Sequence, residues 1–418
     1  MQPAHTSALP HARTVQLDTQ LTADLCIKCN ICTSACPVAA VTDLFPGPKV
    51  VGPQAQRFRE PGAVSRDHAV DYCSGCGVCS LVCPHGVQIA EMNIIAKAGM
   101  AERDGLPLRN RILGRSELLG KLGSFFAPLS NLPIQNKFLR GIGERLLGIS
   151  RQAAFPRFAR QRFRTWFARS GAGRDAAGVY KVVYFHGCST NYYEPRVGQA
   201  AVKVLRHNGC KVSVAQQNCC GLPMQSNGEF AAARAHAEAN LRKLAPYVRE
   251  GYVIVGTSTS CTLTFKHEYR SVLGIRSEEA DLVAGATYDF FEFLEKLDAE
   301  ELLNTRFRRL SNRIVYHAPC QFRTHAVGRP AADLLRRIPG VTVVETTADC
   351  CGVAGTYGLK AEKYQIAKDV GRKAFDEIRN ARAARVVCDS ETCRWWLAQH
   401  TGLPAVHPVE ILAEAYSL

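Results

Sequence analysis

The stretches 26–37, CIKCNICTSACP, and 73–84, CSGCGVCSLVCP, are two copies of one pattern, C-x2-C-x2-C-x3-C-P. This spacing is typical of chains that bind paired cubane 4Fe–4S clusters: three thiolates of a short loop face one cluster, and the fourth reaches the neighbouring cluster. We therefore predict two ligand sets that exchange their last cysteines. These sets are Cys26, Cys29, Cys32 and Cys83 for cluster 1, and Cys73, Cys76, Cys79 and Cys36 for cluster 2. Zinc sites or disulfides are the alternatives, and two matching runs of four cysteines argue against both.

The size and composition of the chain set the broad class. Its 418 residues are enough for two or three domains with cores of their own. Its 18 cysteines would suggest a disulfide framework only in a much shorter secreted chain. No stretch resembles a signal peptide, and none has the roughly 20 apolar residues of a membrane span. We therefore expect a reduced, intracellular protein that does not cross the bilayer, with a disordered tail over residues 1–20.

Four cysteines of the second half of the chain repeat at a spacing of about 130 residues. The first copy has Cys188, Cys219, Cys220 and Cys261, and the second has Cys320, Cys350, Cys351 and Cys393. The surrounding strings match as well: NCCGLP resembles DCCGVAG, and STSC resembles SETC. A repeat this regular implies two copies of one domain, each with its own candidate metal site.

Hydrophobic periodicity alternates between strand and helix within each copy. The predicted strands are Lys181–Phe185, Tyr252–Val255, Arg313–Tyr316 and Val386–Val387, and the predicted helices are Val197–Arg206, Phe230–Val248 and Ala361–Arg379. This alternation favours an α/β layer with a mostly parallel sheet. The cysteines follow the strand ends, where open α/β sheets usually place their sites.

The adjacent cysteines of each copy are followed by glycine, at Gly221 and Gly352. Neighbouring side chains on a strand point in opposite directions, so the backbone must bend for both thiols to face one site. Glycine permits that bend. The alternative is a pair of buried cysteines that act as small apolar groups, which fits poorly with two pairs in register. Cys210 and Cys388 have no counterpart in the other copy, and we predict that they are core thiols.

The order of two cluster motifs and two CCG repeats resembles that of the iron–sulfur subunits of quinone-linked dehydrogenases. FPGPKVVGPQAQRFR at 45–59 and TSTSCTLTFKHEY at 257–269 are similar to segments of the anaerobic glycerol-3-phosphate dehydrogenase family in particular. The resemblance covers nearly the whole chain after about residue 22. It implies an α+β multidomain fold: a helical dicluster ferredoxin-like domain followed by two tandem α/β CCG repeats. We place the dicluster domain at 21–100, a basic amphipathic linker at 101–178, and the repeats at 179–305 and 306–418.

The resemblance also implies a function. It implies a non-catalytic iron–sulfur subunit that takes electrons from a partner flavoprotein, passes them to membrane quinone, and helps to anchor the complex at the cytoplasmic face of the membrane. An iron–sulfur subunit of a glycolate or lactate oxidase is an alternative, and a thiol–disulfide reductase of the CCG type is another. The sequence has no G-x-G-x-x-G loop between a strand and a helix, and GAGRDAAG at 171–178 is interpreted as a linker.

The CCG repeats depart from the fullest form of their motif. Related CCG domains bind a non-cubane 4Fe–4S cluster or zinc, and their motif ends in C-x-x-C. Here Ser258 and Ser390 occupy the first of those two positions. The resemblance therefore leaves open whether each repeat binds a further cluster, zinc or nothing. Cys388 lies close enough in sequence to replace Ser390 as a ligand.

Positive charge is concentrated between the cluster motifs and the repeats. Residues 101–175 contain 15 Arg or Lys and 5 Asp or Glu, which gives this segment a net charge of +10. The whole chain has a net charge of +15, so most of it lies in this segment. Arg157, Arg160, Arg162, Arg164 and Arg169 interleave there with Phe155, Phe158, Phe163, Trp166 and Phe167. An interfacial helix on anionic lipid would have this composition. A docking surface for the partner and aromatics packed on the protein itself are the alternatives. No nucleic-acid-binding motif accompanies the charge. His186 and His317, just before the first cysteine of each repeat, are interpreted as core histidines rather than ligands.

Overall fold

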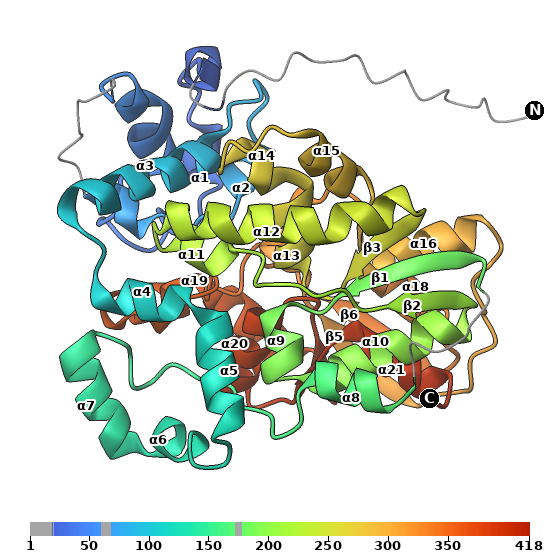
Figure 1. Cartoon of the computed structure of the whole chain (residues 1–418). Coiled ribbons are helices and arrows are strands. Elements are labelled where there is room, and N and C mark those ends of the chain that lie inside the picture. Colours follow the sequence, from blue (N-terminus) through green and yellow to red (C-terminus); the bar gives the residue numbers. More distant parts are fainter. Residues whose placement is uncertain (1–18, 20, 60–67, 172–177) are drawn as a thin grey trace, which may run out of the picture.

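The computed structural model describes residues 19, 21–59, 68–171 and 178–418 (Figure 1). In these residues a helical N-terminal part is followed by two four-stranded sheets with helices around them. The predicted α+β multidomain class is confirmed. The predicted tail at 1–20, apart from Thr19, and the part of the GAGRDAAG segment at 172–177 lie outside the described residues.

The two repeats have sheets of the same topology. All strands of each sheet are parallel, and the order across the sheet is second, first, third and fourth strand. The first sheet consists of β1 (Tyr180–Phe185), β2 (Cys210–Ser213), β3 (Tyr252–Gly256) and β4 (Thr287–Asp289). The second consists of β5 (Asn312–Tyr316), β6 (Val341–Glu345), β7 (Arg385–Val387) and β8 (Ala405–Val406). All four predicted strands and their parallel arrangement are confirmed.

Crossover helices connect the strands. They are α10 (Pro195–His207) and α12 (Phe230–Arg249) in the first repeat, and α18 (Pro330–Arg336) and α19 (Ala361–Asn380) in the second. The three helices predicted from the sequence are present and differ from their predicted bounds by at most two residues. On α10 the residues Val197, Ala201, Val204 and Leu205 are all buried, as expected for one apolar face of an amphipathic helix.

The repeats share one continuous apolar core. α10 packs on α21 (Pro408–Ala415), and α16 (Phe290–Ala299) packs on α18, so each repeat contributes to both contacts. Val182 of the first sheet and Ile314 of the second are fully buried in the same core. Burying a side chain of this size contributes roughly 1.5–3 kcal/mol. This core therefore fixes the two repeats relative to each other.

The N-terminal part consists of short helical turns and one long helix. These are η1 (Leu21–Leu25), α1 (Ile31–Ser34), η2 (Val50–Gln54), η3 (Ala69–Tyr72), α2 (Val78–Leu81) and α3 (Ile89–Asp104). The two cysteine runs share a local fold: Asn30 (φ 72°) or Gly77 (φ 82°) precedes the helix that carries the third cysteine. Asparagine and glycine tolerate this left-handed conformation best. A Cβ at Gly77 would lie 2.9 Å from Thr324 Oγ1, so the second run lies against the second repeat.

In the described part of the connection between the N-terminal part and the first repeat there are five short helices. They are α4 (Leu108–Gly114), α5 (Ser116–Phe125), α6 (Asn131–Gln135), α7 (Lys137–Leu147) and α8 (Phe163–Arg169). The aromatic side chains predicted to meet lipid pack on the protein itself instead. Phe163 is fully buried in the core of the first repeat, Trp166 and Phe167 pack against it, and Phe155 and Phe158 are partly buried.

Most of the exposed apolar side chains of the linker lie on three other helices, α5, α6 and α7. Together they form what we call the apolar face of α5–α7: Leu118, Leu122, Phe125, Leu132, Phe138, Leu139, Ile142 and Leu146. α7 has no buried residue, and it also carries Lys137, Arg140 and Arg145. Figure 1 shows α6 and α7 at the edge of the molecule. None of the described helices has both the length and the apolar composition to span a membrane.

A buried ion pair fastens the N-terminal part to the second repeat. The Lys363 side chain on α19 is 1% exposed; its Nζ donates to the Asp71 carbonyl oxygen at 2.8 Å and pairs with the Asp71 carboxylate. The ammonium group also lies 5.4 Å from the Tyr72 ring centre and 5.3 Å from that of Tyr357. Burial alone would raise the pKa of Asp71, but the positive charges of Lys363 and Lys97 outweigh it and lower that pKa to about 2.

Lys363→Met should lower the free energy of unfolding by about 3 kcal/mol, because it leaves the Asp71 carboxylate without its partner. The same substitution at exposed Lys368 on α19 should change it by less than about 0.5 kcal/mol. A carboxyl with a depressed pKa stabilises the fold above its unfolded-state pKa of about 4 and loses that contribution as the pH falls towards 2. The difference between wild type and Lys363→Met, measured by urea unfolding, should therefore shrink below pH 4. Equal losses for the two variants would contradict this role.

Candidate metal centres

The first predicted ligand set meets at the surface of the N-terminal part. Cys32 is buried, and burial raises its pKa, with further increases from the neighbouring Cys26 and Cys83. Cys26 and Cys83 pack against the same small apolar cluster as Cys32. Cys29 is solvent-exposed. The structure thus brings Cys83, from the second run, to cysteines of the first run.

The second predicted set is buried more deeply. Burial raises the pKa of Cys36 to about 11, and Cys73 adds to this increase. The pKa of Cys79 is likewise raised by burial and by its neighbours Cys76 and Cys73. Cys36 of the first run therefore lies among cysteines of the second run, which is the exchange that the spacing predicted. Ligation by these eight cysteines stays a prediction.

Backbone and amide groups surround the second set. The backbone N–H of Gly75 donates to Cys73 Sγ at 3.4 Å, and Asn93 Nδ2 donates to the same sulfur at 3.7 Å. Lys97 Nζ donates to the Cys73 carbonyl oxygen. Donors of this kind stabilise a thiolate and tune the potential of a centre that it holds. Cys32, Cys36 and Cys79, whose pKa values are raised by burial, would lose their protons when iron binds. Each set supplies four thiols, so both sets fit 4Fe–4S clusters, which would supply one-electron redox chemistry there.

The four cysteines of the first repeat form one group. Cys188 lies on α9 (Gly187–Tyr192), Cys219 and Cys220 lie between β2 and α11 (Leu222–Ser226), and Cys261 lies on α13 (Thr259–Leu263). Thiol hydrogen bonds from Cys188 and Cys220 lower the pKa of Cys219 well below its usual value. Cys261 in turn contacts Cys220. The repeated cysteines therefore converge, although they come from three separate segments.

The second repeat has the same group and one more sulfur. Cys351 Sγ lies 3.1 Å from Cys393 Sγ, and Cys350 contacts both Cys320 and Cys351. Cys320 begins α17 (Cys320–Thr324), and Cys393 lies on α20 (Glu391–Thr401). Cys388, interpreted from the sequence as a core thiol, is fully buried and contacts Cys393. It is thus placed to act as the fifth cysteine of this site.

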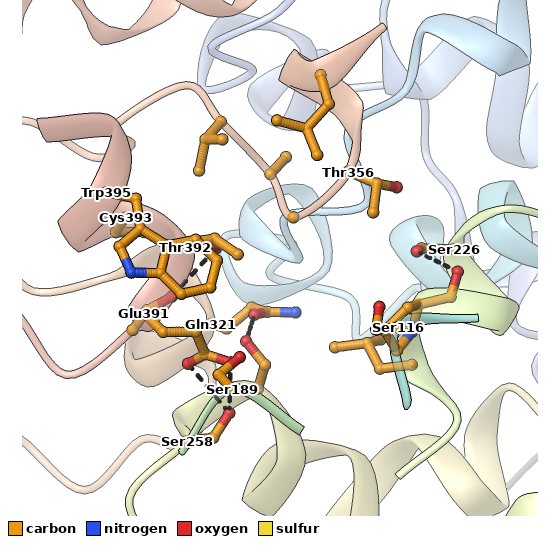
Figure 2. Close-up of a pocket in the computed structure, with 18 of the residues that line it drawn as sticks. Ser116, Ser189, Ser226, Ser258, Gln321, Thr356, Glu391, Thr392, Cys393 and Trp395 are labelled. Carbon is orange, nitrogen blue, oxygen red and sulfur yellow. Dashed lines mark hydrogen bonds between the residues drawn. The ribbon is translucent and has the colours of Figure 1, made fainter. Parts of the chain in front are cut away.

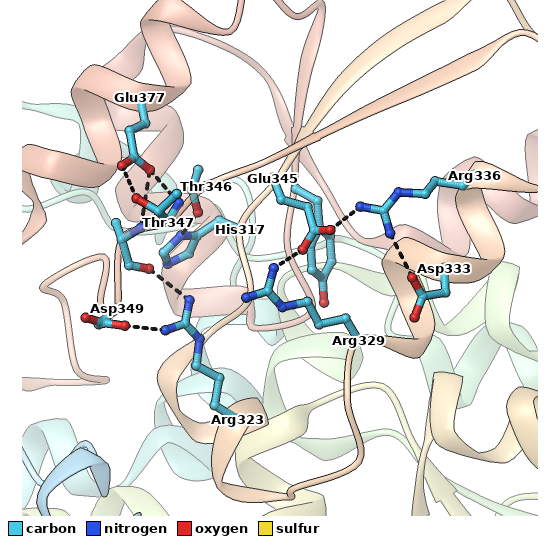
Figure 3. Close-up of polar contacts among 12 residues, drawn as sticks. His317, Arg323, Arg329, Asp333, Arg336, Glu345, Thr346, Thr347, Asp349 and Glu377 are labelled. Carbon is cyan, nitrogen blue, oxygen red and sulfur yellow. Dashed lines mark hydrogen bonds and ion pairs between the residues drawn. The ribbon is translucent and has the colours of Figure 1, made fainter. Parts of the chain in front are cut away.

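The loop that presents Cys350 and Cys351 is fastened on both sides (Figure 3). Glu377 on α19 accepts from the Thr347 backbone N–H at 2.7 Å and from its hydroxyl at 2.6 Å. Arg323 on α17 donates to the Ala348 carbonyl oxygen at 3.1 Å and pairs with Asp349. These bonds hold the chain in the bend that the adjacent cysteines require.

The first repeat uses different residues for the same purpose. Asn240 on α12 accepts from the Asn218 backbone N–H at 2.8 Å and donates to the Cys219 carbonyl oxygen at 2.9 Å. Glu117 on α5 accepts from the Cys219 backbone N–H at 2.7 Å. The Tyr269 hydroxyl donates to the Cys220 carbonyl oxygen at 2.8 Å. A linker helix therefore helps to build the first site.

Ser258 and Ser390, which stand where the fullest CCG motif has cysteines, make different contacts. Ser258 Oγ donates to both carboxylate oxygens of Glu391 at 3.2 Å, and Ser189 Oγ donates to one of them at 2.9 Å (Figure 2). Glu391 belongs to the second repeat, so this contact joins the two sites. Ser390 instead hydrogen-bonds Cys393.

The histidines and the remaining cysteine complete the predicted candidates. His186 and His317 are buried, and burial lowers their pKa values, that of His186 to about 4. His317 Nδ1 shares a hydrogen bond of 2.8 Å with Thr346 Oγ1, and the Nε2 of each ring has no partner among the described residues. Cys210 lies in the apolar core away from both sites, and burial raises its pKa to about 12.

One cavity connects the sites of the two repeats. It has a volume of about 280 Å³, and its lining includes the repeated cysteines of both copies together with Cys76 of the second ligand set. Burial and then the charge of Cys350 raise the pKa of Cys76, which shows that these two sulfurs are neighbours. Within the described ranges no group of three or more His, Cys, Asp or Glu has the arrangement for a single metal ion.

Comparisons with known proteins agree with this architecture. The 4Fe-4S dicluster domain family matches residues 22–87, and the cysteine-rich domain family matches residues 182–266 and 314–398. The chain is thus an iron–sulfur protein with a dicluster domain and two cysteine-rich domains. It is 35% identical to a subunit of the anaerobic glycerol-3-phosphate dehydrogenase of Escherichia coli strain K12 over 394 residues, which cover 93% of this chain and 98% of the relative. The chain belongs to this family of dehydrogenase subunits.

More distant relatives belong to other oxidoreductases. The glycolate oxidase iron-sulfur subunit of Escherichia coli strain K12 is 25% identical over 417 residues, 97% of this chain and 96% of the relative. A subunit of the fumarate reductase (CoM/CoB) of Methanothermobacter marburgensis is 26% identical over 382 residues, 88% of this chain and 66% of the relative. The architecture therefore occurs in subunits of several oxidoreductases.

Several site residues were not singled out from the sequence. Glu117 and Glu391 are ordinary polar residues of helical segments, and only the tertiary contacts show that they border the cysteines. Glu268 and Gln225, which line the cavity, are equally inconspicuous. No spacing or composition in one sequence identifies such residues.

Gly352→Ala should destabilise the protein by about 3 kcal/mol, since a Cβ there would collide with the Ala367 carbonyl oxygen and the residue has φ 94°. Gly402→Ala is the matched control, because Gly402 has φ 75° and open space around its Cβ position. It should cost about 1 kcal/mol, from backbone strain alone. Urea unfolding measures both losses, and iron analysis should show a deficit only for Gly352→Ala. Equal losses and equal iron contents would show that the turn at Cys351 tolerates a side chain.

Proposed function

We propose that this chain is the electron-transfer subunit of a quinone-linked anaerobic glycerol-3-phosphate dehydrogenase. It receives electrons from a partner flavoprotein, delivers them to membrane quinone at the cytoplasmic face, and helps to anchor the complex there. The observation that carries this proposal is the unbroken succession of cysteine groups. The succession begins at solvent-exposed Cys29 and continues through the second set, where Cys76 neighbours Cys350, into the cavity between the repeats.

The surface around Cys29 is suited to a protein partner. Several large apolar side chains near the first ligand set are exposed: Leu21, Leu25, Ile27, Ile31 and Leu44. Exposed apolar patches mark interaction surfaces, and we propose that these side chains form one. The partner flavoprotein would dock here, because electrons must enter at the ligand set closest to the surface.

The apolar face of α5–α7 is suited to a membrane. It combines exposed leucine, isoleucine and phenylalanine side chains with basic residues of α7 such as Lys137 and Arg145. Such helices lie in the lipid interface, where apolar side chains enter the acyl region and basic groups meet anionic headgroups. This face takes the place of the aromatic segment that the sequence suggested.

Cys76→Ser should reduce quinone reduction by the assembled complex at least about a hundredfold and leave dye reduction by the flavoprotein partner within twofold, since a serine hydroxyl is a poor ligand for iron. Iron analysis and EPR should show the loss of about four irons and one cluster signal. Cys210→Ser, at the core thiol away from the sites, should retain both activities and the full iron content. Loss of dye reduction together with quinone reduction would contradict the proposed division between subunits.

Phe138→Glu combined with Leu146→Glu should weaken binding to vesicles that contain anionic lipid by at least about tenfold, because it removes two apolar side chains from the interface and adds negative charge. Both residues are exposed, at 75% and 76%. Phe58→Glu, at a 78% exposed position of the N-terminal part, should leave vesicle binding unchanged. Vesicle co-sedimentation at low and high salt measures the effect. Equal binding of all three proteins would rule out this face as the anchor.

A glycolate oxidase subunit is the second candidate, because the glycolate oxidase relative aligns along nearly the whole chain. The higher identity to the glycerol-3-phosphate dehydrogenase subunit favours the first candidate. Reconstitution with each flavoprotein separates them: only the natural partner should couple its substrate to quinone reduction through this chain.

A further inference from the structure

The cavity between the repeats extends beyond the cysteines. Besides the cysteines, its lining has an apolar part: Leu113, Leu119, Ile134, Phe155, Phe158 and Leu222. Figure 2 shows Ser116 and Ser226, which also line the cavity, well separated from Cys393 and Glu391. Iron–sulfur clusters require thiolate ligands, so any cluster lies against the cysteines. The apolar part of the lining is left to contact another molecule.

A buried polar pair also lines the cavity. Gln225 is fully buried, and its Oε1 has no hydrogen-bond partner among the described residues. Its Nε2 donates to Glu268 Oε2 at 3.1 Å, and Thr264 Oγ1 donates to the same oxygen at 2.9 Å. Buried polar atoms without partners are rare in native proteins, and each requires an explanation such as a ligand. Burial raises the pKa of Glu268 to about 7, so a large fraction of its carboxyl groups carry a proton at neutral pH and can donate it.

Linker helices supply part of the apolar lining. Leu119 on α5 and Ile134 on α6 line the cavity. On the same two helices Leu118 and Leu132 point outwards and are 50% and 63% exposed. These outward residues belong to the apolar face of α5–α7. These short helices therefore lie between the cavity and the surface that we assign to the membrane.

We propose that the apolar part of the cavity binds the ring of a membrane quinone, which enters from the bilayer past α5 and α6. This inference rests on the proposed function, since it places the electron acceptor named there. A quinone ring is flat and apolar with two carbonyl oxygens, which matches apolar walls with a carboxylic acid donor. The whole cavity, including the part beside the cysteines, has a volume of about 280 Å³, which is near the roughly 300 Å³ at which ligand pockets begin. It has no room for an isoprenoid tail, so only the ring enters and the tail stays in the lipid.

Quinone reduction at this site consumes two electrons and two protons. The quinone becomes the quinol, and the electrons originate in the substrate oxidised by the partner flavoprotein. The protons come from the Glu268 carboxyl, which regains them from water after each transfer. The quinol then leaves for the bilayer by the route through which the quinone entered.

Photolabelling with an azidoquinone tests the location directly. The probe is added to the complex of this chain with its flavoprotein in lipid vesicles, and labelled peptides are identified by mass spectrometry. We expect labels within residues 113–119, 131–136 and 154–158. Leu119→Trp and, separately, Ile134→Trp should fill the cavity, reduce this labelling at least about fivefold, and raise the KM for quinone, while iron content and dye reduction stay unchanged. Leu108→Trp, at a 62% exposed position of α4, should leave all four readouts unchanged.

The outcomes distinguish this inference from the proposed function. If the complex reduces quinone but the label falls on other peptides, or if both tryptophan variants keep full labelling and KM, the cavity is not the quinone site although the function stands. If the complex reduces no quinone, the proposed function fails first. If an organic disulfide displaces the label and is itself reduced, the cavity serves thiol–disulfide chemistry and the inference is overturned.

Glu268→Gln tests the proton donor separately. The variant keeps the shape and the hydrogen bonds to Gln225 and Thr264 but cannot supply a proton. Azidoquinone labelling should persist, and kcat for quinone should fall at least about a hundredfold with KM little changed. An unchanged kcat would overturn the role of Glu268, and loss of labelling would show that it serves in binding instead.

Discussion

The gathering of buried thiols is the constraint on which the rest of this structure depends. Burial and mutual repulsion raise the pKa values of cysteines such as Cys36 and Cys79, so these groups are costly to ionise without a cation. Iron removes that cost and binds the thiolates firmly. The left-handed turns at Asn30 and Gly77, and the collision that excludes a side chain at Gly352, serve to bring the sulfurs together.

The two repeats form one functional unit because polar contacts cross between them at the sites. Ser258 of the first repeat donates to Glu391 of the second, and Arg394 of the second repeat pairs with Glu194 of the first. Arg394 is 2% exposed and also donates to the carbonyl oxygen of Cys388 at 2.9 Å. A buried ion pair of this kind fixes geometry more than it stabilises the fold. The ion pair lies beside Cys388, which has no counterpart in the first repeat, so the second site differs from the first.

The exposed apolar surfaces lie near the two ends of the succession of cysteine groups. Exposed apolar side chains surround the ligand set that reaches solvent, while a second exposed apolar face lies on α5–α7, beside the cavity between the repeats. The partner and the lipid surface that we propose would use separate faces, so both could be bound at once. The linker helices have two roles, since α5 also supplies Glu117 to the backbone of Cys219. Contact with a membrane would therefore act close to the first CCG site.

The sequence by itself determined the motifs, the repeat and its strands and helices, because these depend on local spacing and periodicity. The exchange of Cys36 and Cys83 followed from spacing as well. Only the tertiary structure decided that Cys388 adjoins Cys393, that Cys76 neighbours Cys350, and that one cavity joins both repeats. It also decided among the three alternatives for the aromatic segment, since Phe163 packs in the core of the protein itself. Such contacts join residues far apart along the chain, so local spacing does not reveal them. In a sequence, apolar side chains that pack in a core have the same pattern as apolar side chains that contact lipid.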